Sequence, residues 1–251
     1  MDPSDLTAVI AAKDEAATIV DVIRGCREHC GEILVVVDRR TRDATAALAF
    51  AAGARVLVDG GRGKGHALRL AIAEIRTPVA VFVDADGSHD PADIPSVVRP
   101  IADGRADHVS ASRLTGGSSE LHGGFDEFFR LAGSSFITAC INRRFGVRLS
   151  DSQNGFRAIR TDVLRRLGLT EDSTTIEQEM IIRSLGLGFR IAEVPSHEHA
   201  RKAGVSHINV RRAAFRYVFS FVRHLYGTRW RAIAPARVET ERVDGVLPVN
   251  R

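Results

Sequence analysis

Residues 79–88, Val-Ala-Val-Phe-Val-Asp-Ala-Asp-Gly-Ser, are the stretch from which the fold of this chain can be read. The run opens with apolar, mostly β-branched residues, a pattern that predicts a buried strand of a parallel sheet. It ends in Asp84 and Asp86, and ligands in open α/β sheets bind just beyond the carboxyl ends of the strands. Two carboxylates so placed suit Mg²⁺ or Mn²⁺ that carries a substrate diphosphate. The alternative is a polar strand end that runs into an Asp/Gly turn.

The composition is that of an ordinary soluble globular protein, because 251 residues with 44% hydrophobic content can form a full core. No apolar run reaches the roughly 18 residues that a membrane-spanning helix needs, and the N-terminus is acidic where a signal peptide would be basic. Cys26 and Cys30 lie one helical turn apart, a spacing that supports neither a disulfide framework nor a zinc site. We therefore expect a cytoplasmic protein.

Strand and helix patterns alternate along the first half of the chain. We expect strands at 6–11, 32–38, 55–59, 79–84 and 108–112, and helices at 15–30, 43–52, 64–75 and 91–102. This alternation predicts an α/β fold with a mostly parallel central sheet flanked by helices. In the second half we expect a long helix at 126–145, an extended segment at 155–159, a helix at 176–185 and a strand at 189–195.

Basic residues are concentrated near the C-terminus. Between Arg201 and Arg237 there are nine Arg or Lys and no Asp or Glu, which leaves 26 basic and 31 acidic residues elsewhere. At 100° per residue this segment predicts an amphipathic helix. Its apolar stripe is Phe215, Val218, Val222, Leu225 and Tyr226, and its basic edge is Arg212, Arg216 and Arg223. Such a helix can lie on an anionic membrane surface as a peripheral contact, or it can pack against the domain.

The chain accordingly divides into three parts. We expect an α/β domain at 5–205, a basic amphipathic helical segment at 206–234 and a poorly ordered tail at 235–251. The basic segment contains no recognisable nucleic-acid motif and its aromatic residues fall on the apolar side, so no nucleic-acid partner is expected.

Two further strand ends carry residues that suit a nucleotide. Asp38 follows the predicted second strand and can accept hydrogen bonds from a ribose or a base, although it can also cap the next helix. The loop at 60–65, Gly-Gly-Arg-Gly-Lys-Gly, is not a Walker A motif, because no Ser or Thr follows Lys64. Its glycines and its two basic residues near a helix N-terminus still suit an anionic nucleotide sugar, or they form only a loop and a helix start.

Several blocks occur in a fixed order along the chain. They are Ala11-Ala12-Lys13-Asp14-Glu15, residues 38–45, Gly63-Lys64-Gly65, Asp84-Ala85-Asp86, Ser112-Arg113, residues 151–157, Glu179, residues 193–195 and residues 201–206. In this order they resemble family 2 glycosyltransferases of the GT-A fold, in particular polyprenyl-phosphate (dolichyl-phosphate) hexosyltransferases, over about Thr7 to Ser206. The first block lacks the family's proline and aromatic residue, and Arg39 departs from the second block.

The resemblance implies a Rossmann-like nucleotide-diphospho-sugar transferase and a donor site. Residues matching the nucleotide-sugar site are Ala11, Lys13, Glu15, Asp38, Lys64, Asp84, Ala85 and Asp86. Asp84, Asp86 and Ser88 match the metal site, so the resemblance implies Mg²⁺ or Mn²⁺ as cofactor. A metal there neutralises the leaving diphosphate.

The resemblance also implies an acceptor site built on arginines. Arg113, Arg130 and Arg201 match positions that bind the acceptor phosphate, and guanidinium suits phosphate because it offers a bidentate fork. Arg130 lies on a long helix, where an arginine usually faces solvent. Asp151 and Glu179, with Arg113, are the candidate catalytic residues. If the acceptor is a hydroxyl, one of the two carboxylates must remove its proton, whereas an ionised phosphate needs no base.

We therefore expect an inverting, metal-dependent transfer of a hexose from a GDP-mannose-type or UDP-glucose-type donor to a polyprenyl phosphate. Transfer to a hydroxyl of a soluble glycan or small molecule is the alternative within the same class. A nucleotide-sugar-binding protein without transferase activity is the alternative of another class, and the intact carboxylates Asp84, Asp86, Asp151 and Glu179 argue against it. The sequence distinguishes neither the donor base nor its sugar.

Overall fold

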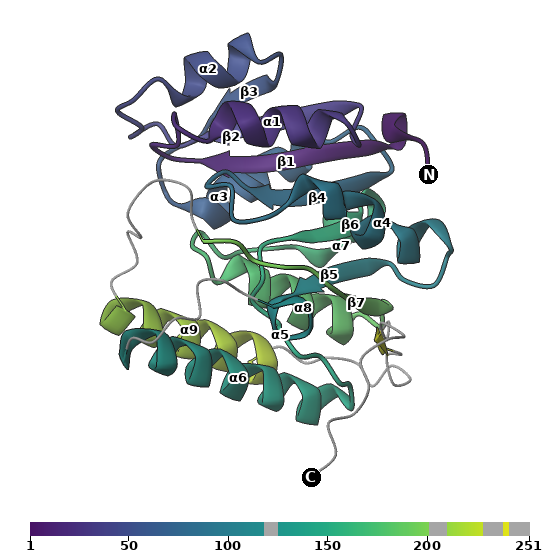
Figure 1. The fold of residues 1–251 in the computed structure, drawn as a ribbon. Helices are drawn as coiled ribbons and strands as arrows, with labels where there is room; N and C mark the ends of the chain where they lie inside the picture. Colours follow the sequence, from purple (N-terminus) through teal and green to yellow (C-terminus); the bar gives the residue numbers. More distant parts are fainter. Residues whose placement is uncertain (118–124, 201–209, 228–237, 241–251) are drawn as a thin grey trace.

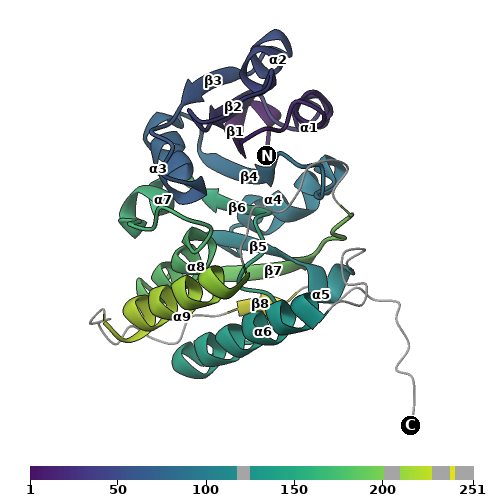
Figure 2. The same cartoon turned by 90° about the vertical axis from the view of Figure 1, so that its left-hand side faces the viewer.

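The computed structural model describes residues 1–117, 125–200, 210–227 and 238–240, with the side chains of all of these except 125–131, 210–216 and 238–240. The described residues form three layers, with helices on both faces of a mixed sheet (Figures 1 and 2). The strands are β1 Leu6–Ala12, β2 Glu32–Val37, β3 Arg55–Val58, β4 Val79–Asp84, β5 His108–Ser112, β6 Arg157–Arg160, β7 Ile191–Pro195 and β8 Val238–Thr240. The predicted α/β class is confirmed.

The α-helices are α1 Ile19–Arg27, α2 Thr45–Ala51, α3 Lys64–Glu74, α4 Ile94–Ala102, α5 Arg113–Gly116, α6 Phe125–Phe145, α7 Thr161–Leu167, α8 Ile176–Gly186 and α9 Val210–Tyr226. Short 3-10 helices cover Pro3–Asp5 (η1) and Pro91–Asp93 (η2). None of the helices within the described ranges is both long and apolar enough to cross a membrane.

The sheet brings the predicted functional strand ends to one edge. Its order is β3-β2-β1-β4-β6-β5-β7-β8, and within it β6 runs antiparallel to β4 and β5. Strands β2, β1 and β4 are parallel, with Ala12 opposite Val37 and Ala11 opposite Asp84. Because parallel strands end on the same side, the residues that follow β1, β2 and β4 meet at one edge.

Two hydrophobic cores lie on the two faces of the sheet. Helices α1, α2 and α4 cover one face, where alternate residues of the strands, such as Ile10 and Val81, point toward them. Helices α3, α7 and α8 cover the other face and pack on Val9, Leu34 and Phe82. Each strand therefore buries both of its faces, which explains why the strand sequences are continuous apolar runs.

The strand predictions hold to within two residues at each end. The four helix predictions of the first half run too long, whereas those at 126–145 and 176–185 are each one residue short. The helix expected at 15–30 begins at Ile19, because Asp14 adopts a positive φ of 57° and residues 16–18 form a turn before the helix. Helix α7 was not predicted from the sequence. Within the tail predicted to be poorly ordered, β8 pairs with β7, and residues 241–251 lie outside the described part.

Helix α9 packs on α6 and α8 and thereby divides the predicted apolar stripe between two sides. Leu225, which the stripe includes, is buried with Phe221 against the third hydrophobic cluster. Val218 and Val222, from the same stripe, are exposed. The predicted stripe therefore does not form one face: Leu225 belongs to the buried side of the helix, and Val218 and Val222 belong to the exposed side. The side chains of Phe215, Arg212 and Arg216 lie outside the described part.

The glycine loop before α3 is packed tightly against the loop that precedes α8. A Cβ on Gly63 would lie 2.5 Å from the carbonyl oxygen of Asp172, and one on Gly65 would lie 2.7 Å from that of Ser173. Asp172 also forms ion pairs with Arg62 and Arg69. The glycines are therefore required for two backbone segments, far apart in the sequence, to touch.

We expect Gly65→Ala to lower the free energy of unfolding by about 3 kcal/mol, because the clash is with backbone atoms that cannot rotate away. Urea denaturation measures this change. Gly133→Ala in α6 is the matched control, since no atom lies within 4 Å of the added methyl. The control should be neutral or stabilising by up to about 1 kcal/mol. Equal stability of the two variants would contradict the tight contact.

Candidate active site

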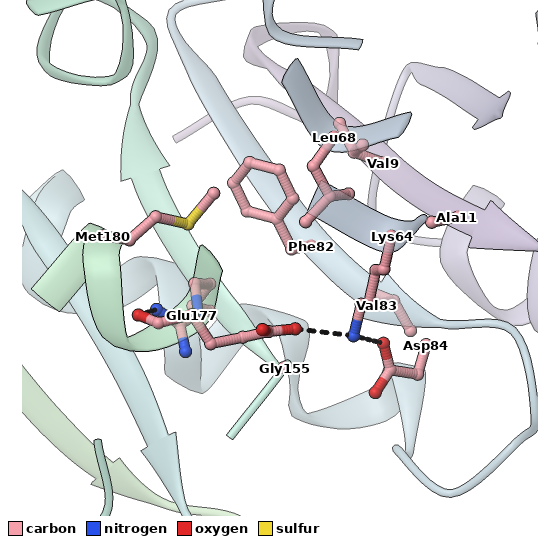
Figure 3. A pocket seen from close by; sticks show the side chains of 11 residues that line it. Val9, Ala11, Lys64, Leu68, Phe82, Val83, Asp84, Gly155, Glu177 and Met180 are labelled. Carbon is pink, nitrogen blue, oxygen red and sulfur yellow. Dashed lines mark hydrogen bonds and ion pairs between the residues drawn. The ribbon is translucent and has the colours of Figure 1, made fainter. Parts of the chain in front are cut away.

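A small pocket lies on the face of the sheet that α3 and α8 cover, over the carboxyl-terminal halves of β1 and β4 (Figure 3). It is lined by Val9, Ala11, Lys64, Leu68, Phe82, Val83, Asp84, Gly155, Arg157, Glu177 and Met180. The strands and both helices supply the apolar wall, and the four charged side chains come from four separate segments of the chain, α3, β4, β6 and α8. Through Asp84 the pocket reaches the carboxyl end of β4, at the edge where open α/β sheets bind ligands.

Lys64 is the central cation of this pocket. Its Nζ lies 2.5 Å from Asp84 Oδ1 and 2.8 Å from Glu177 Oε1, as the dashed lines of Figure 3 show. Burial favours the neutral amine, but the two carboxylates outweigh it and raise the pKa of Lys64. The ammonium group is therefore held charged between two acids, where it can also meet an anionic ligand.

Arg157 adds a second, fully buried cation. It projects from β6, opposite Phe82 of β4, and is 1% exposed. Burial lowers the pKa of its guanidinium, against the raising effect of Glu177, Asp151 and Asp84. Its Nε and the Oε2 of Glu177 have no hydrogen-bond partner among the described residues. Buried polar atoms are normally bonded, so these two atoms leave hydrogen-bonding capacity in the pocket that a water or a polar group of a ligand can satisfy.

The Asp84-Ala85-Asp86 turn is braced from several directions. The amide of Asp84 donates to Nδ1 of His89, 3.3 Å away, and the Ala85 carbonyl oxygen accepts from Thr18 at 2.7 Å. Asp86 is 7% exposed and accepts from both the amide and the hydroxyl of Ser88. Ser88 therefore holds the Asp86 carboxylate in place.

Gly155 lies against the carboxylate of Asp84, where an added Cβ would be 2.7 Å from Oδ2. No side chain larger than hydrogen fits there without moving Asp84.

The β1 and β2 ends contribute the other residues predicted for the donor site. Asp38 is buried and accepts from the amide and the guanidinium of Arg40. These hydrogen bonds, outweighing burial, lower the pKa of Asp38, and the charge of Lys13 adds to the effect. Glu15 begins the turn before α1, where its amide donates to Thr45 Oγ1. Ala11 and Lys64 line the pocket, whereas Asp38 and Glu15 lie outside its lining.

Arg113 and Asp151 form a second charged group. Arg113 Nε lies 2.6 Å from Asp151 Oδ2, and Arg113 Nη1 lies 3.5 Å from Glu198. Burial alone would lower the pKa of Arg113, but the two carboxylates raise it. The carboxylate of Glu193 accepts from the amides of Ser150 and Asp151 and so fixes the backbone beside the pair.

Glu179 does not reach the pocket. Its carboxylate is fully buried on the other side of α8, where it accepts from the amides of Thr170 and Glu171 and pairs with Arg183 at 2.7 Å. Glu177, two residues earlier, faces the pocket instead. Sequence reasoning missed Glu177, although the Arg183 at i+4 is a signal that Glu179 has a structural partner.

Helix α9 reaches the same region from outside the sheet. The Tyr217 hydroxyl donates to Thr174 Oγ1 at 2.8 Å, and its backbone carbonyl accepts from Gln178. Burial raises the pKa of Tyr217 to about 12, the charge of Glu177 adds to this, and those of Lys64 and Arg113 oppose it. Tyr217 was not among the predicted site residues. The side chain of Arg130, within α6, and all of Arg201 lie outside the described part.

We expect Glu179→Ala to destabilise the fold by about 3 to 5 kcal/mol, because it leaves Arg183 and two loop amides without their buried partner. Thermal or urea unfolding measures the loss. Asp162→Ala, which removes an exposed ion pair with Arg160, is the control and should cost less than about 1 kcal/mol. A stable Glu179→Ala protein would be inconsistent with this structural role.

Comparisons with known proteins identify the family of this chain. The sequence model described as "Glycosyl transferase family 2" matches residues 7–168. A dolichyl-phosphate hexose transferase of Haloferax volcanii is 32% identical over 196 residues, 76% of this chain and 81% of that protein. Glycosyltransferase AglJ of the same organism is 29% identical over 80% of this chain. The match spans 65% of AglJ and 41% of a second Haloferax hexosyltransferase, Agl6, so the chain corresponds to part of those proteins.

Solved structures agree on the fold. Glucosyl-3-phosphoglycerate synthase from Mycobacterium tuberculosis, crystallised with Mn²⁺, UDP and phosphoglyceric acid, superposes with a TM-score of 0.71 at 21% identity. The superposition covers 88% of this chain and 78% of the other. The predicted GT-A fold is confirmed. The chain belongs to glycosyl transferase family 2.

Proposed function

We propose that this chain transfers a hexose from a nucleotide-diphosphate sugar to a polyprenyl phosphate, with inversion at the anomeric carbon. The observation that carries the proposal is the pocket in which Lys64, Asp84, Arg157 and Glu177 converge over the carboxyl-terminal halves of β1 and β4. Its unpartnered Arg157 Nε and Glu177 Oε2 suit a ligand with both acceptor and donor groups, such as a sugar diphosphate. The 32% identical relative named as a dolichyl-phosphate hexose transferase supports the choice of acceptor.

The donor residues of this proposal are those of the strand ends. Ala11 and Asp84 lie side by side in the sheet, and Asp38 follows the neighbouring strand. Lys64, at the start of α3, meets the diphosphate as a cation near a helix N-terminus. Binding requires Lys64 to exchange its contact with Asp84 or Glu177 for one with phosphate oxygens.

Asp84 and Asp86, with Ser88 supporting Asp86, would hold Mg²⁺ or Mn²⁺. Within the described ranges no three acidic, His or Cys side chains converge on one point. Two carboxylates still fit, because Mg²⁺ is commonly bound by one or two carboxylates together with substrate phosphates and water. When bound, such a metal neutralises charge on the leaving diphosphate. The family-fold neighbours crystallised with Mn²⁺ or Mg²⁺ and UDP support this cofactor.

The acceptor residues are proposed around Arg113 and Asp151, which are not among the residues that line the pocket. Arg113 can bind a phosphate through the guanidinium nitrogens that point toward Glu198, while Asp151 holds its orientation. Arg130 and Arg201 remain proposed acceptor residues on the basis of sequence. A phosphate monoester is ionised at neutral pH, so it attacks the anomeric carbon without a general base, and attack opposite the leaving diphosphate inverts that carbon.

A hydroxyl acceptor is the second candidate, and Glu177 favours it. A hydroxyl must lose its proton as it attacks, and a pocket carboxylate with one unpartnered oxygen can accept that proton. Glu177 takes the place that the sequence interpretation gave to Glu179. Both carboxylates are paired with a cation, but Arg113 donates to both oxygens of Asp151, whereas Glu177 keeps Oε2 without a partner, so Glu177 is the stronger candidate base.

Donor turnover tests the proposal. The protein is incubated with Mn²⁺ or Mg²⁺ and with GDP-mannose, UDP-glucose or UDP-N-acetylglucosamine, and mass spectrometry measures the release of GDP or UDP. We expect release from one of these donors, and only when a short polyprenyl phosphate is present. Asp86→Asn should lower the rate at least about 100-fold, because a neutral amide holds a divalent cation poorly. Asp90→Asn, at an exposed cap four residues on, is the matched control. Donor turnover that is unaffected by the polyprenyl phosphate would exclude polyprenyl phosphate as the acceptor.

Glu177→Gln distinguishes the two acceptors. For a phosphate acceptor the rate should fall by no more than about tenfold, since only the contact with Lys64 weakens. For a hydroxyl acceptor the loss of a general base should lower kcat by about 10² to 10⁴. The rate is measured at saturating donor and acceptor, with each acceptor class supplied separately.

A further inference from the structure

The outer faces of α6 and α9 carry an exposed apolar surface. Phe219 and Tyr226 of α9 are 66% and 65% exposed, and Phe136 of α6 is 66% exposed. Val218 and Val222 of α9 are exposed beside them. Of the nine large hydrophobic side chains that are exposed in the described part of the chain, five belong to these two helices. Both views show α6 and α9 side by side on the outside of the molecule (Figures 1 and 2).

Packing within the domain does not account for these side chains. Helix α9 already has a buried face, which is formed by Ser220, Phe221, His224 and Leu225. His224 is fixed there by Glu171, 2.8 Å away. The exposed side chains lie on the opposite side of the same helix, where a helix of a water-soluble domain normally carries polar residues. Within the described part of the chain, nothing covers this outer face, so it is available to a surface outside the domain.

The charges around this face select the kind of surface. Arg223 is exposed on α9, and Arg143 and Arg144 are exposed at the end of α6. The sequence has no Asp or Glu between residues 132 and 150 or between 199 and 238. The two acids of α6, Asp126 and Glu127, lie in its first turn, before this stretch. Aromatic and aliphatic side chains flanked by arginines are the composition of helices that lie at a membrane interface. Negative lipid headgroups attract such arginines.

We propose that the outer face of α6 and α9, formed by Phe136, Val218, Phe219, Val222 and Tyr226, docks on an anionic lipid bilayer. The apolar side chains enter the interfacial region and the arginines contact headgroups. Tyr217 on the inner side of α9 lies near Glu177 and Lys64, so docking would hold the pocket close to the bilayer. That last consequence rests on the proposed transfer to a lipid phosphate, whereas docking itself does not.

Vesicle flotation of the full chain tests the docking. Vesicles of phosphatidylcholine with phosphatidylglycerol should carry the protein upward, and vesicles of phosphatidylcholine alone should carry less. Phe219→Ser with Val222→Ser should lower the partition coefficient about tenfold, because two apolar side chains no longer enter the interface. Arg223→Ser should lower binding to the anionic vesicles and leave binding to the phosphatidylcholine vesicles unchanged. Phe50→Ser is the matched control, because Phe50 is 73% exposed on α2, a helix that lies at the other end of the molecule from α6 and α9 in Figure 1. This variant should bind as the unaltered protein does.

Three results would overturn the proposal. They are no flotation of the unaltered protein with anionic vesicles, equal binding by the Phe219/Val222 variant, and equal loss in the Phe50 variant. A dimer in sedimentation that the Phe219/Val222 variant dissociates, without vesicle binding, would identify a second copy of the chain as the occupant. Flotation uses neither donor nor acceptor, so its failure is separate from failure of the proposed transferase reaction.

Discussion

The buried ammonium group of Lys64 joins the two halves of this protein. It lies between Asp84, at the end of a central strand, and Glu177, at the start of a helix that is about 90 residues further along the chain. The two carboxylates and the ammonium group are tolerated in a partly buried site only because each carboxylate is paired with the ammonium group. The close fit of Gly63 and Gly65 against residues 171–173 allows this approach. The pocket, and every charge within it, depends on that contact.

The same contact gives neighbouring acids different roles. Glu177 and Glu179 are two residues apart on one helix, yet one points to the pocket and the other caps a buried loop. Glu179 stabilises the 170–171 turn, the turn leads into the segment that meets the glycine loop, and the glycine loop carries Lys64. Glu179, outside the pocket, thus helps to position Lys64 inside it. Glu177 and Glu179 point to different sides of α8 because each helical residue is rotated by 100° from the one before it.

Helix α9 connects the pocket with the outside of the molecule. Its inner side is held by Tyr217, Phe221 and His224, and its outer side carries apolar side chains toward solvent. A helix that is apolar on both sides is expected where a protein meets both its own core and a second nonaqueous surface. The sequence pattern predicted an amphipathic helix. It could not show which side of that helix faces inward, because the packing of α9 against α6 and α8 determines the orientation.

The sequence by itself determined the order of strands and helices in the first half, the α/β class and the positions of Asp38, Lys64 and Asp84 at strand or loop ends, because these depend on local apolar periodicity and on turns. Tertiary structure decided what distant segments contribute. The selection of Glu177 over Glu179, the burial of Arg157 and the approach of Tyr217 all depend on how α8, β6 and α9 pack on the sheet. Contacts between residues far apart in the chain leave no periodic pattern, and so they are read only from the folded molecule.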